Sequence, residues 1–197
     1  MDASLTIIDD FYNDPDSVRD IALSCNYHSE KVSKGYPNGN APWSGTMSKD
    51  AYSPSWVDTV VSKHLNKNLR QMRQLDSGHF RISKETNVVG MFDNLLHFDR
   101  HEEIYYAGVL YLSKDKHTTP GTLFYRHKET GAYKAPVEID RTEFNDPSKW
   151  DIHTTSNVVY NRLLIYPASQ YHGPGPCFGN DDNTARIVQL FNWIDIK

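Results

Sequence analysis

The 197-residue sequence has few cysteines, no long apolar run and no excess of basic residues. Its two cysteines, Cys25 and Cys177, lie far apart and do not resemble a disulfide framework, which is typical of a reducing compartment. No stretch approaches the ~20 apolar residues of a membrane helix, and residues 1–10 lack the pattern of a signal peptide. A net charge of −4 argues against a surface dedicated to nucleic acid. We therefore expect a cytoplasmic protein with no membrane partner.

The chain length suits one domain, residues 1–197, with helical patterns first and strand patterns later. Asp14-Pro15 and Ser53-Pro54 predict the starts of two helices in a supporting N-terminal part, residues 1–77. Short apolar runs separated by turns then predict a core over residues 78–197. The predicted strands are 6–8, 79–83, 87–99, 105–113, 121–127, 158–167 and 184–194. The polar segment 128–157 predicts either a functional flap or disorder.

A histidine two residues before an acid can supply two ligands to a metal, because alternate strand residues point to the same side. Nine histidines and 25 acids in 197 residues give about one such pair by chance, so the pattern alone is weak. The sequence contains four pairs: His28/Glu30, His97/Asp99, His101/Glu103 and His127/Glu129. The surrounding sequence must therefore decide between them.

His97 and Asp99 end an apolar run, and a strongly β-prone run begins at Tyr105. This pair therefore lies where one core strand ends and the next returns, which is where a metal ligand is expected. The main rival is His101/Glu103 in the same predicted loop, which we interpret as a solvated polar pair. Two histidines and one carboxylate around iron leave three positions for other ligands.

The order of motifs from residue 87 to residue 193 resembles the prolyl-4-hydroxylase-like branch of the Fe(II)/2-oxoglutarate dioxygenase superfamily. The matching motifs are His97-x-Asp99, residues 108–113 (GVLYLS), residues 121–124 (GTLF), residues 161–167 (NRLLIYP), His172 and Arg186. The resemblance implies a double-stranded β-helix, or jelly roll, so the expected class is α+β, mainly β, with supporting N-terminal helices. The doublet of glycines usual in the family is reduced to Pro120-Gly121, and residues 173–183 form a long loop rich in glycine and proline.

The resemblance also implies the site. His172 would be the third ligand of Fe(II), beside His97 and Asp99. Arg186 would bind the distal carboxylate of 2-oxoglutarate, together with Tyr111. In the predicted strand 184–194, Arg186 should share a face with Val188 and Leu190, and an arginine on an apolar inward face needs a partner. Two alternatives stay open here: Arg186 could reach solvent from the strand start, or Arg126 could be the anchor.

The resemblance implies an enzyme that consumes 2-oxoglutarate and O2 and hydroxylates a substrate C–H bond. By the same analogy the substrate would be an amino-acid or peptidyl side chain, with a small metabolite or a nucleobase as alternatives. A cupin-like metal-binding jelly roll without 2-oxoglutarate chemistry is the second hypothesis. A purely structural β-sandwich is the third.

Overall fold

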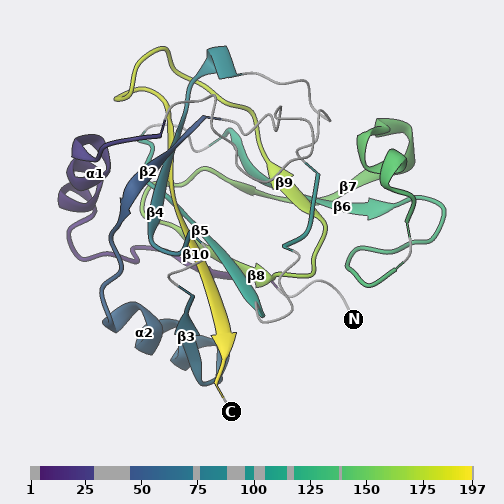
Figure 1. Ribbon diagram of the computed structural model, residues 1–197, viewed down its shortest axis with the longest axis horizontal. Coiled ribbons are helices and arrows are strands. Elements are labelled where there is room, and N and C mark those ends of the chain that lie inside the picture. Colours follow the sequence, from purple (N-terminus) through teal and green to yellow (C-terminus); the bar gives the residue numbers. More distant parts are fainter. Residues whose placement is uncertain are drawn as a thin grey trace.

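The computed structural model describes residues 5–28, 45–72, 76–87, 96–99, 105–114, 118–137 and 139–196. This part of the chain is mostly β, with two antiparallel sheets and two α-helices (Figure 1). The helices are α1 (Pro15–Ser24), α2 (Trp56–Leu65) and the short 3-10 helices η1 (Glu85–Asn87), η2 (Arg141–Asn145) and η3 (Pro147–Lys149). The strands are β1 (Thr6–Ile8), β2 (Thr46–Ala51), β3 (Leu69–Gln71), β4 (His79–Ser83), β5 (Tyr106–Tyr111), β6 (Pro120–His127), β7 (Trp150–Asn157), β8 (Leu163–Pro167), β9 (His172–Pro174) and β10 (Arg186–Asp195).

The larger sheet has the order β1-β8-β5-β10-β4-β2, and β3 pairs with the far end of β10. Strand β10 is its longest, and it pairs with β5 on one side and with β4 on the other. The alternation of side chains along β10 therefore decides which residues face the interior of the molecule.

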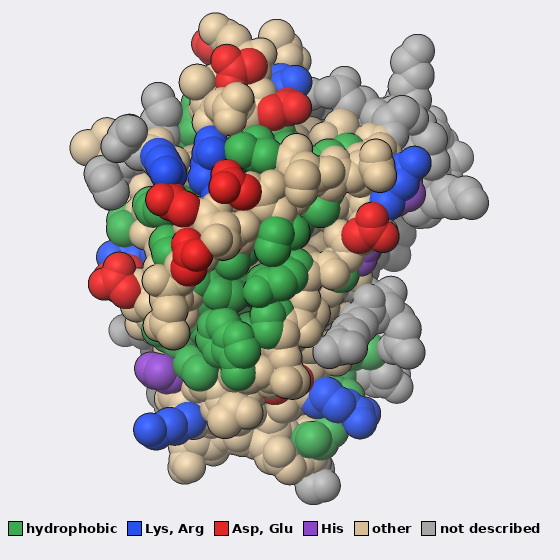
Figure 2. All heavy atoms as spheres, turned by 90° about the vertical axis from the view of Figure 1, so that its left-hand side faces the viewer, with side chains coloured by type: hydrophobic (Ala, Val, Ile, Leu, Met, Phe, Trp, Pro, Cys, Tyr) green, Lys and Arg blue, Asp and Glu red, His purple; other side chains and the backbone are tan. Residues whose placement is uncertain are grey.

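Both α-helices pack on the outer face of this sheet. Asp14 caps α1, because its carboxylate accepts a hydrogen bond of 3.1 Å from the backbone N–H of Ser17. Helix α2 lies against β10, where the fully buried indole of Trp193 donates a hydrogen bond to Asp58 Oδ1 at 3.1 Å. Figure 2 views this side and shows a hydrophobic patch with charged side chains above and beside it. None of the described helices is long and apolar enough to cross a membrane.

The smaller sheet has the order β7-β6-β9 and faces the inner side of the larger one. An apolar layer between the sheets joins Val109 and Val188 of the larger sheet to Phe124 of the smaller one. On the outer side of the smaller sheet, Trp150 and Tyr171 form a second aromatic cluster with ring centroids 5.1 Å apart. Strands β6 and β7 and their connection project as a lobe on the right of Figure 1.

The structure differs from the sequence predictions mainly in the polar segments. Segment 128–157 is not disordered along its length, because residues 150–157 form β7 and pair with β6. A functional flap in this segment stays a prediction. Residues 1–77, expected as helical support, also contribute β1, β2 and β3 to the larger sheet. The predicted strand 158–167 shortens to β8, because residues 158–162 turn through Asn161, whose φ is 62°. Residues 88–95 of the predicted strand 87–99 lie outside the described part.

Candidate metal centre

Residues 96–99 add an extended segment beside β9. His97 and His172 exchange two backbone hydrogen bonds of 2.8 Å each, and the backbone N–H of Asp99 donates to Ala168 O at 2.9 Å. In this extended backbone Phe98 points to the outer side, where it meets Tyr171. The side chains of His97 and Asp99 therefore share the inner side.

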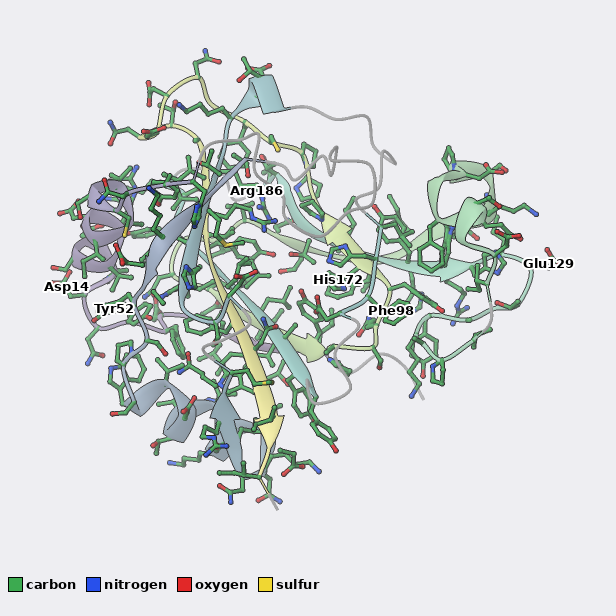
Figure 3. All side chains as sticks on the ribbon, viewed as in Figure 1. Asp14, Tyr52, Phe98, Glu129, His172 and Arg186 are labelled. Carbon is green, nitrogen blue, oxygen red and sulfur yellow. The ribbon has the colours of Figure 1, made fainter. Side chains whose placement is uncertain are left out.

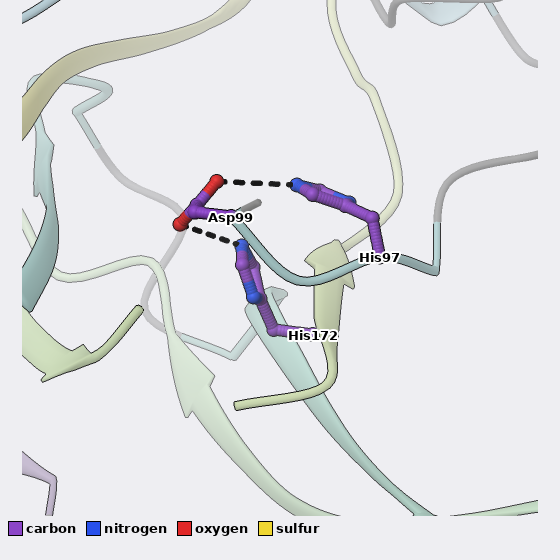
Figure 4. A group of neighbouring side chains, drawn as sticks. All are labelled: His97, Asp99 and His172. Atoms are coloured by element: carbon purple, nitrogen blue, oxygen red, sulfur yellow. Dashed lines mark ion pairs between the residues drawn. The ribbon is translucent and has the colours of Figure 1, made fainter. Parts of the chain in front are cut away.

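The structure brings His97, Asp99 and His172 together as the sequence predicted. One ligand atom from each residue lies within 4.8 Å of the others, so the group could hold a metal ion. Each histidine Nε2 lies 4.0 Å from a different carboxylate oxygen of Asp99 (Figure 4). The two imidazole rings have centroids 4.3 Å apart. Separations of this size leave room for one ion between the three side chains.

The protonation of His172 follows from its backbone partner. Its Nδ1 lies 2.9 Å from Gln170 O, and because a carbonyl oxygen only accepts, Nδ1 carries the proton. Nε2 then presents its lone pair toward Asp99 and His97, which is the arrangement that orients a metal-binding histidine. Burial lowers the pKa of His172 to about 4, and the neighbouring His97 acts in the same direction. The imidazole is therefore neutral at physiological pH.

A cavity of about 160 Å³ opens beside these three side chains, between the two sheets. Its apolar wall comes from alternate residues of two strands of the larger sheet, including Val109 of β5 and Val188 and Leu190 of β10. Figure 3 shows His172 and Arg186 near the centre of the molecule, both at this cavity. The cavity therefore connects the candidate metal centre with the predicted carboxylate anchor.

Arg186 begins β10 and lies inside the molecule, with 3% of its surface exposed. The sequence alternative in which it reaches solvent is therefore wrong. Its Nη2 donates to Gly121 O at 2.9 Å, whereas its buried Nε has no hydrogen-bond partner among the residues that the structure describes. Burial lowers the pKa of Arg186. A buried guanidinium that is only partly hydrogen-bonded is costly unless an anion completes its contacts.

Tyr111 is fully buried and does not itself line the cavity. Its hydroxyl lies 2.7 Å from Thr122 Oγ1, and Thr122 does line the cavity. Tyr111 therefore contacts Thr122 from outside the cavity, at the end of the cavity where Arg186 lies. Burial raises the pKa of Tyr111, so the hydroxyl stays protonated at physiological pH.

The remaining candidates lie elsewhere. Arg126 is exposed and is not a lining residue of this cavity. His127 is buried but bonds Glu143 at 2.7 Å, and Glu129 lies far from His172 at the tip of the lobe (Figure 3). His101 and Glu103 lie outside the described residues.

Trp150, His153 and Tyr160 are not lining residues of the cavity. Trp150 is buried and its indole Nε1 donates to Glu143 O at 2.8 Å. His153 is exposed on β7, and Tyr160 donates a hydrogen bond of 2.5 Å to Asp16 on α1. Each therefore has a packing or surface role.

Sequence reasoning missed several lining residues, among them Arg81, Thr122 and Tyr166. The pattern at Arg81 was misleading, because a charged residue between the buried Phe80 and Ile82 lies on the opposite face of the strand, which sequence alone assigns to solvent. Thr122 and Tyr166 had none, since a threonine and a tyrosine in a strand are ordinary.

The fold and the site define a mostly β protein with a candidate metal centre in the wall of an internal cavity. The chain belongs to a protein family of unknown function, DUF6445, whose model matches residues 1–154. That match includes His97 and Asp99 and ends before His172 and Arg186. No curated protein matches the sequence.

Among solved structures, the chain is similar to a prolyl hydroxylase from Trichoplax adhaerens, in complex with a hypoxia inducible factor oxygen degradation domain peptide fragment. The TM-score is 0.52 at 11% identity, covering 97% of this chain and 83% of that one. A Pseudomonas putida prolyl-4-hydroxylase gives 0.48 at 12% identity, covering 99% and 94%. EvdMO1 gives 0.49 at 13% identity, covering 92% and 42%. Of these three, the first alone exceeds 0.5, and at such low identity it shows a common fold alone.

Proposed function

We propose that this protein is an Fe(II)- and 2-oxoglutarate-dependent dioxygenase of the prolyl-4-hydroxylase-like branch. In this proposal the two facing sheets form a double-stranded β-helix, and the substrate is an amino-acid or peptidyl side chain. One observation carries the proposal: His97, Asp99 and His172 converge within 4.8 Å in the wall of a cavity that also contains the buried Arg186. A metal centre facing a buried cation suits a ligand that chelates metal at one end and is anionic at the other.

The donor set fits Fe(II). Two imidazole nitrogens and one carboxylate on one side of an ion form the facial arrangement of non-haem iron oxygenases, which leaves open positions. The hydrogen bond from His172 Nδ1–H to Gln170 O supports this assignment, because it orients Nε2 as a ligand. When bound there, iron(II) would supply the redox chemistry of oxygen activation.

The protein's own residues would position the co-substrate. Arg186 offers a planar guanidinium whose buried Nε has no partner in the described part of the chain, and a carboxylate would satisfy it by a charge-assisted bond. Thr122, held by the Tyr111 hydroxyl, presents its side chain at the same end of the cavity. We assign Arg186 to the distal carboxylate and Tyr111 to the orientation of Thr122. The apolar wall around Val188 would keep water from the bound co-substrate.

Anaerobic titration with Fe(II) and then with 2-oxoglutarate tests the proposal. We expect one Fe(II) per chain and a visible charge-transfer band when 2-oxoglutarate is added. His97→Ala and His172→Ala should each abolish the band. His64→Ala is the matched control, because His64 is exposed on α2 and should leave the band unchanged.

Two results would contradict the proposal. Iron binding with no response to 2-oxoglutarate would favour a metal-binding jelly roll without 2-oxoglutarate chemistry. Normal bands in both folded histidine variants would mean that other residues hold the metal.

A further inference from the structure

A second arginine faces the same cavity as Arg186. In the pairing of β4 with β10, Arg81 lies opposite Val188 and Ser83 lies opposite Arg186. Arg81 and Arg186 are therefore diagonal neighbours on one face of the sheet, a relation that places backbone positions about 7–8 Å apart and lets long side chains meet. Both residues line the cavity.

Two guanidinium groups side by side repel each other, and here Arg186 is buried and Arg81 is partly buried. Burial and the charge of Arg186 together lower the pKa of Arg81 to about 10, and Asp76 acts in the opposite direction. Arg81 still carries its proton at neutral pH. Among the described residues, two acids line the cavity: Asp99, which lies next to the two histidines, and Asp76, which is exposed and offsets part of the charge of Arg81. The cavity therefore favours an anionic ligand more strongly than one arginine alone would.

The position of Arg81 indicates which part of a ligand it would meet. Val188 of β10 has Arg81 opposite it on β4 and Tyr111 opposite it on β5. This row of three lies next to Arg186 along β10. The candidate metal centre lies further along the sheet. His172 contacts Tyr166, with ring centroids 4.7 Å apart, and Tyr166 pairs with Ala107, which is four residues before Tyr111 on β5. Arg81 therefore belongs to the end of the cavity away from the metal centre.

We propose that Arg81 is a second binding residue for the distal carboxylate of the co-substrate, which would lie between the guanidinium groups of Arg81 and Arg186. The inference rests on the proposed function for the identity of the ligand. It adds a residue from β4, outside the motifs that suggested the dioxygenase. A carboxylate held by two arginines gains a second charge-assisted contact and relieves the repulsion between them.

The test is calorimetric titration of 2-oxoglutarate into the protein loaded with Zn²⁺, which supports binding without turnover. The variants are Arg81→Gln, Arg81→Lys and Arg186→Gln, with Arg70→Gln as the matched control because Arg70 is an exposed arginine on β3. We expect Arg81→Gln to weaken binding about 10- to 100-fold, the usual effect of losing a hydrogen bond to a charged group. Arg81→Lys should fall between it and the wild type, since lysine keeps the charge and loses the planar fork. Arg70→Gln should bind as the wild type does.

The outcomes separate this inference from the proposed function. If Arg186→Gln loses affinity while folded Arg81→Gln binds within twofold of the wild type, the role of Arg81 is wrong and the proposed function stands. If the wild type does not bind 2-oxoglutarate, both are wrong. If Arg81→Gln does not fold, Arg81→Lys decides in its place, and wild-type affinity in that variant overturns the inference.

Discussion

Gly121 offers a test of the carboxylate end of the cavity that removes no polar group. A Cβ added at this position would lie 2.7 Å from Tyr111 Cε1 and Cζ and 2.8 Å from its hydroxyl oxygen. Carbon atoms do not approach so closely, and Tyr111 is fully buried, so its ring must move. The carbonyl of Gly121 also accepts the hydrogen bond from Arg186. Gly121→Ala should therefore disturb Tyr111 and Arg186 together.

The expected loss of stability is about 1–3 kcal/mol, the usual cost of adding one methyl group to a packed interior. The backbone of Gly121 is in an ordinary strand conformation, so steric overlap is the main source of this cost. Urea unfolding measures it. We also expect an affinity for 2-oxoglutarate at least about tenfold weaker, because a displaced Tyr111 no longer holds Thr122 and the Arg186 contact shifts.

Gly131→Ala is the matched control for Gly121→Ala. Gly131 has a φ of 69° and nothing within 4 Å of an added Cβ, so alanine there costs about 1–2 kcal/mol through backbone strain alone. Both variants should lose similar stability, but Gly121→Ala alone should lose affinity. Wild-type stability and affinity in Gly121→Ala would refute the described packing of Tyr111 over Gly121.

Three further substitutions test the fold. Asn161→Ala removes two 2.9 Å hydrogen bonds to the backbone of Tyr12 and strains a φ of 62°, so urea unfolding should show a loss of about 2–4 kcal/mol. Trp150→Ala should cost about 3–5 kcal/mol in the same assay, and a change below 1 kcal/mol would contradict its burial. The hydrogen bond from Arg162 lowers the pKa of Asp9, so this pair stabilises the protein above the unfolded pKa of about 3.9 and loses that effect as the pH falls. Because Asp9 is half-exposed, Asp9→Asn should cost less than about 1 kcal/mol at pH 7 and nothing near pH 2.

Local patterns predicted the core strands well. Strands β1 and β4 have the predicted bounds, and β5, β6 and β10 begin or end within two residues of theirs, because buried strands have regular apolar runs. The pattern could not predict β2 and β7. Their outward residues are polar on exposed edges, as in Asp151 and Thr155, and their pairing depends on partners far along the chain. Strand β9 is too short to have a period of its own.

The residues of the candidate site also fall into those that the sequence could predict and those that it could not. His97 and Asp99 could be predicted as a pair because two residues in extended backbone share a side. That His172 lies beside them required the resemblance, since nothing local relates residues so far apart. Arg81 was missed because the rule applied to Arg186 does not extend to it. Arg186 shares a face with Val188 and Leu190, whereas the apolar neighbours of Arg81 in β4 lie on the opposite face of the strand.

The positions of Arg81 and Arg186 show how β4, which lies outside the motifs of the sequence resemblance, contributes to the charge of the cavity. Strand β4 follows the N-terminal part of the chain, yet it pairs with β10 directly beside Arg186. Its register fixes Arg81 in the same row as Val188, so a shift of one residue would turn Arg81 to the outer face and Phe80 into the cavity. The pairing is antiparallel and continues from Phe80 to Ser83. The charge of the cavity is thus set by the register of β4 on β10 as much as by the identity of the residue at the start of β10.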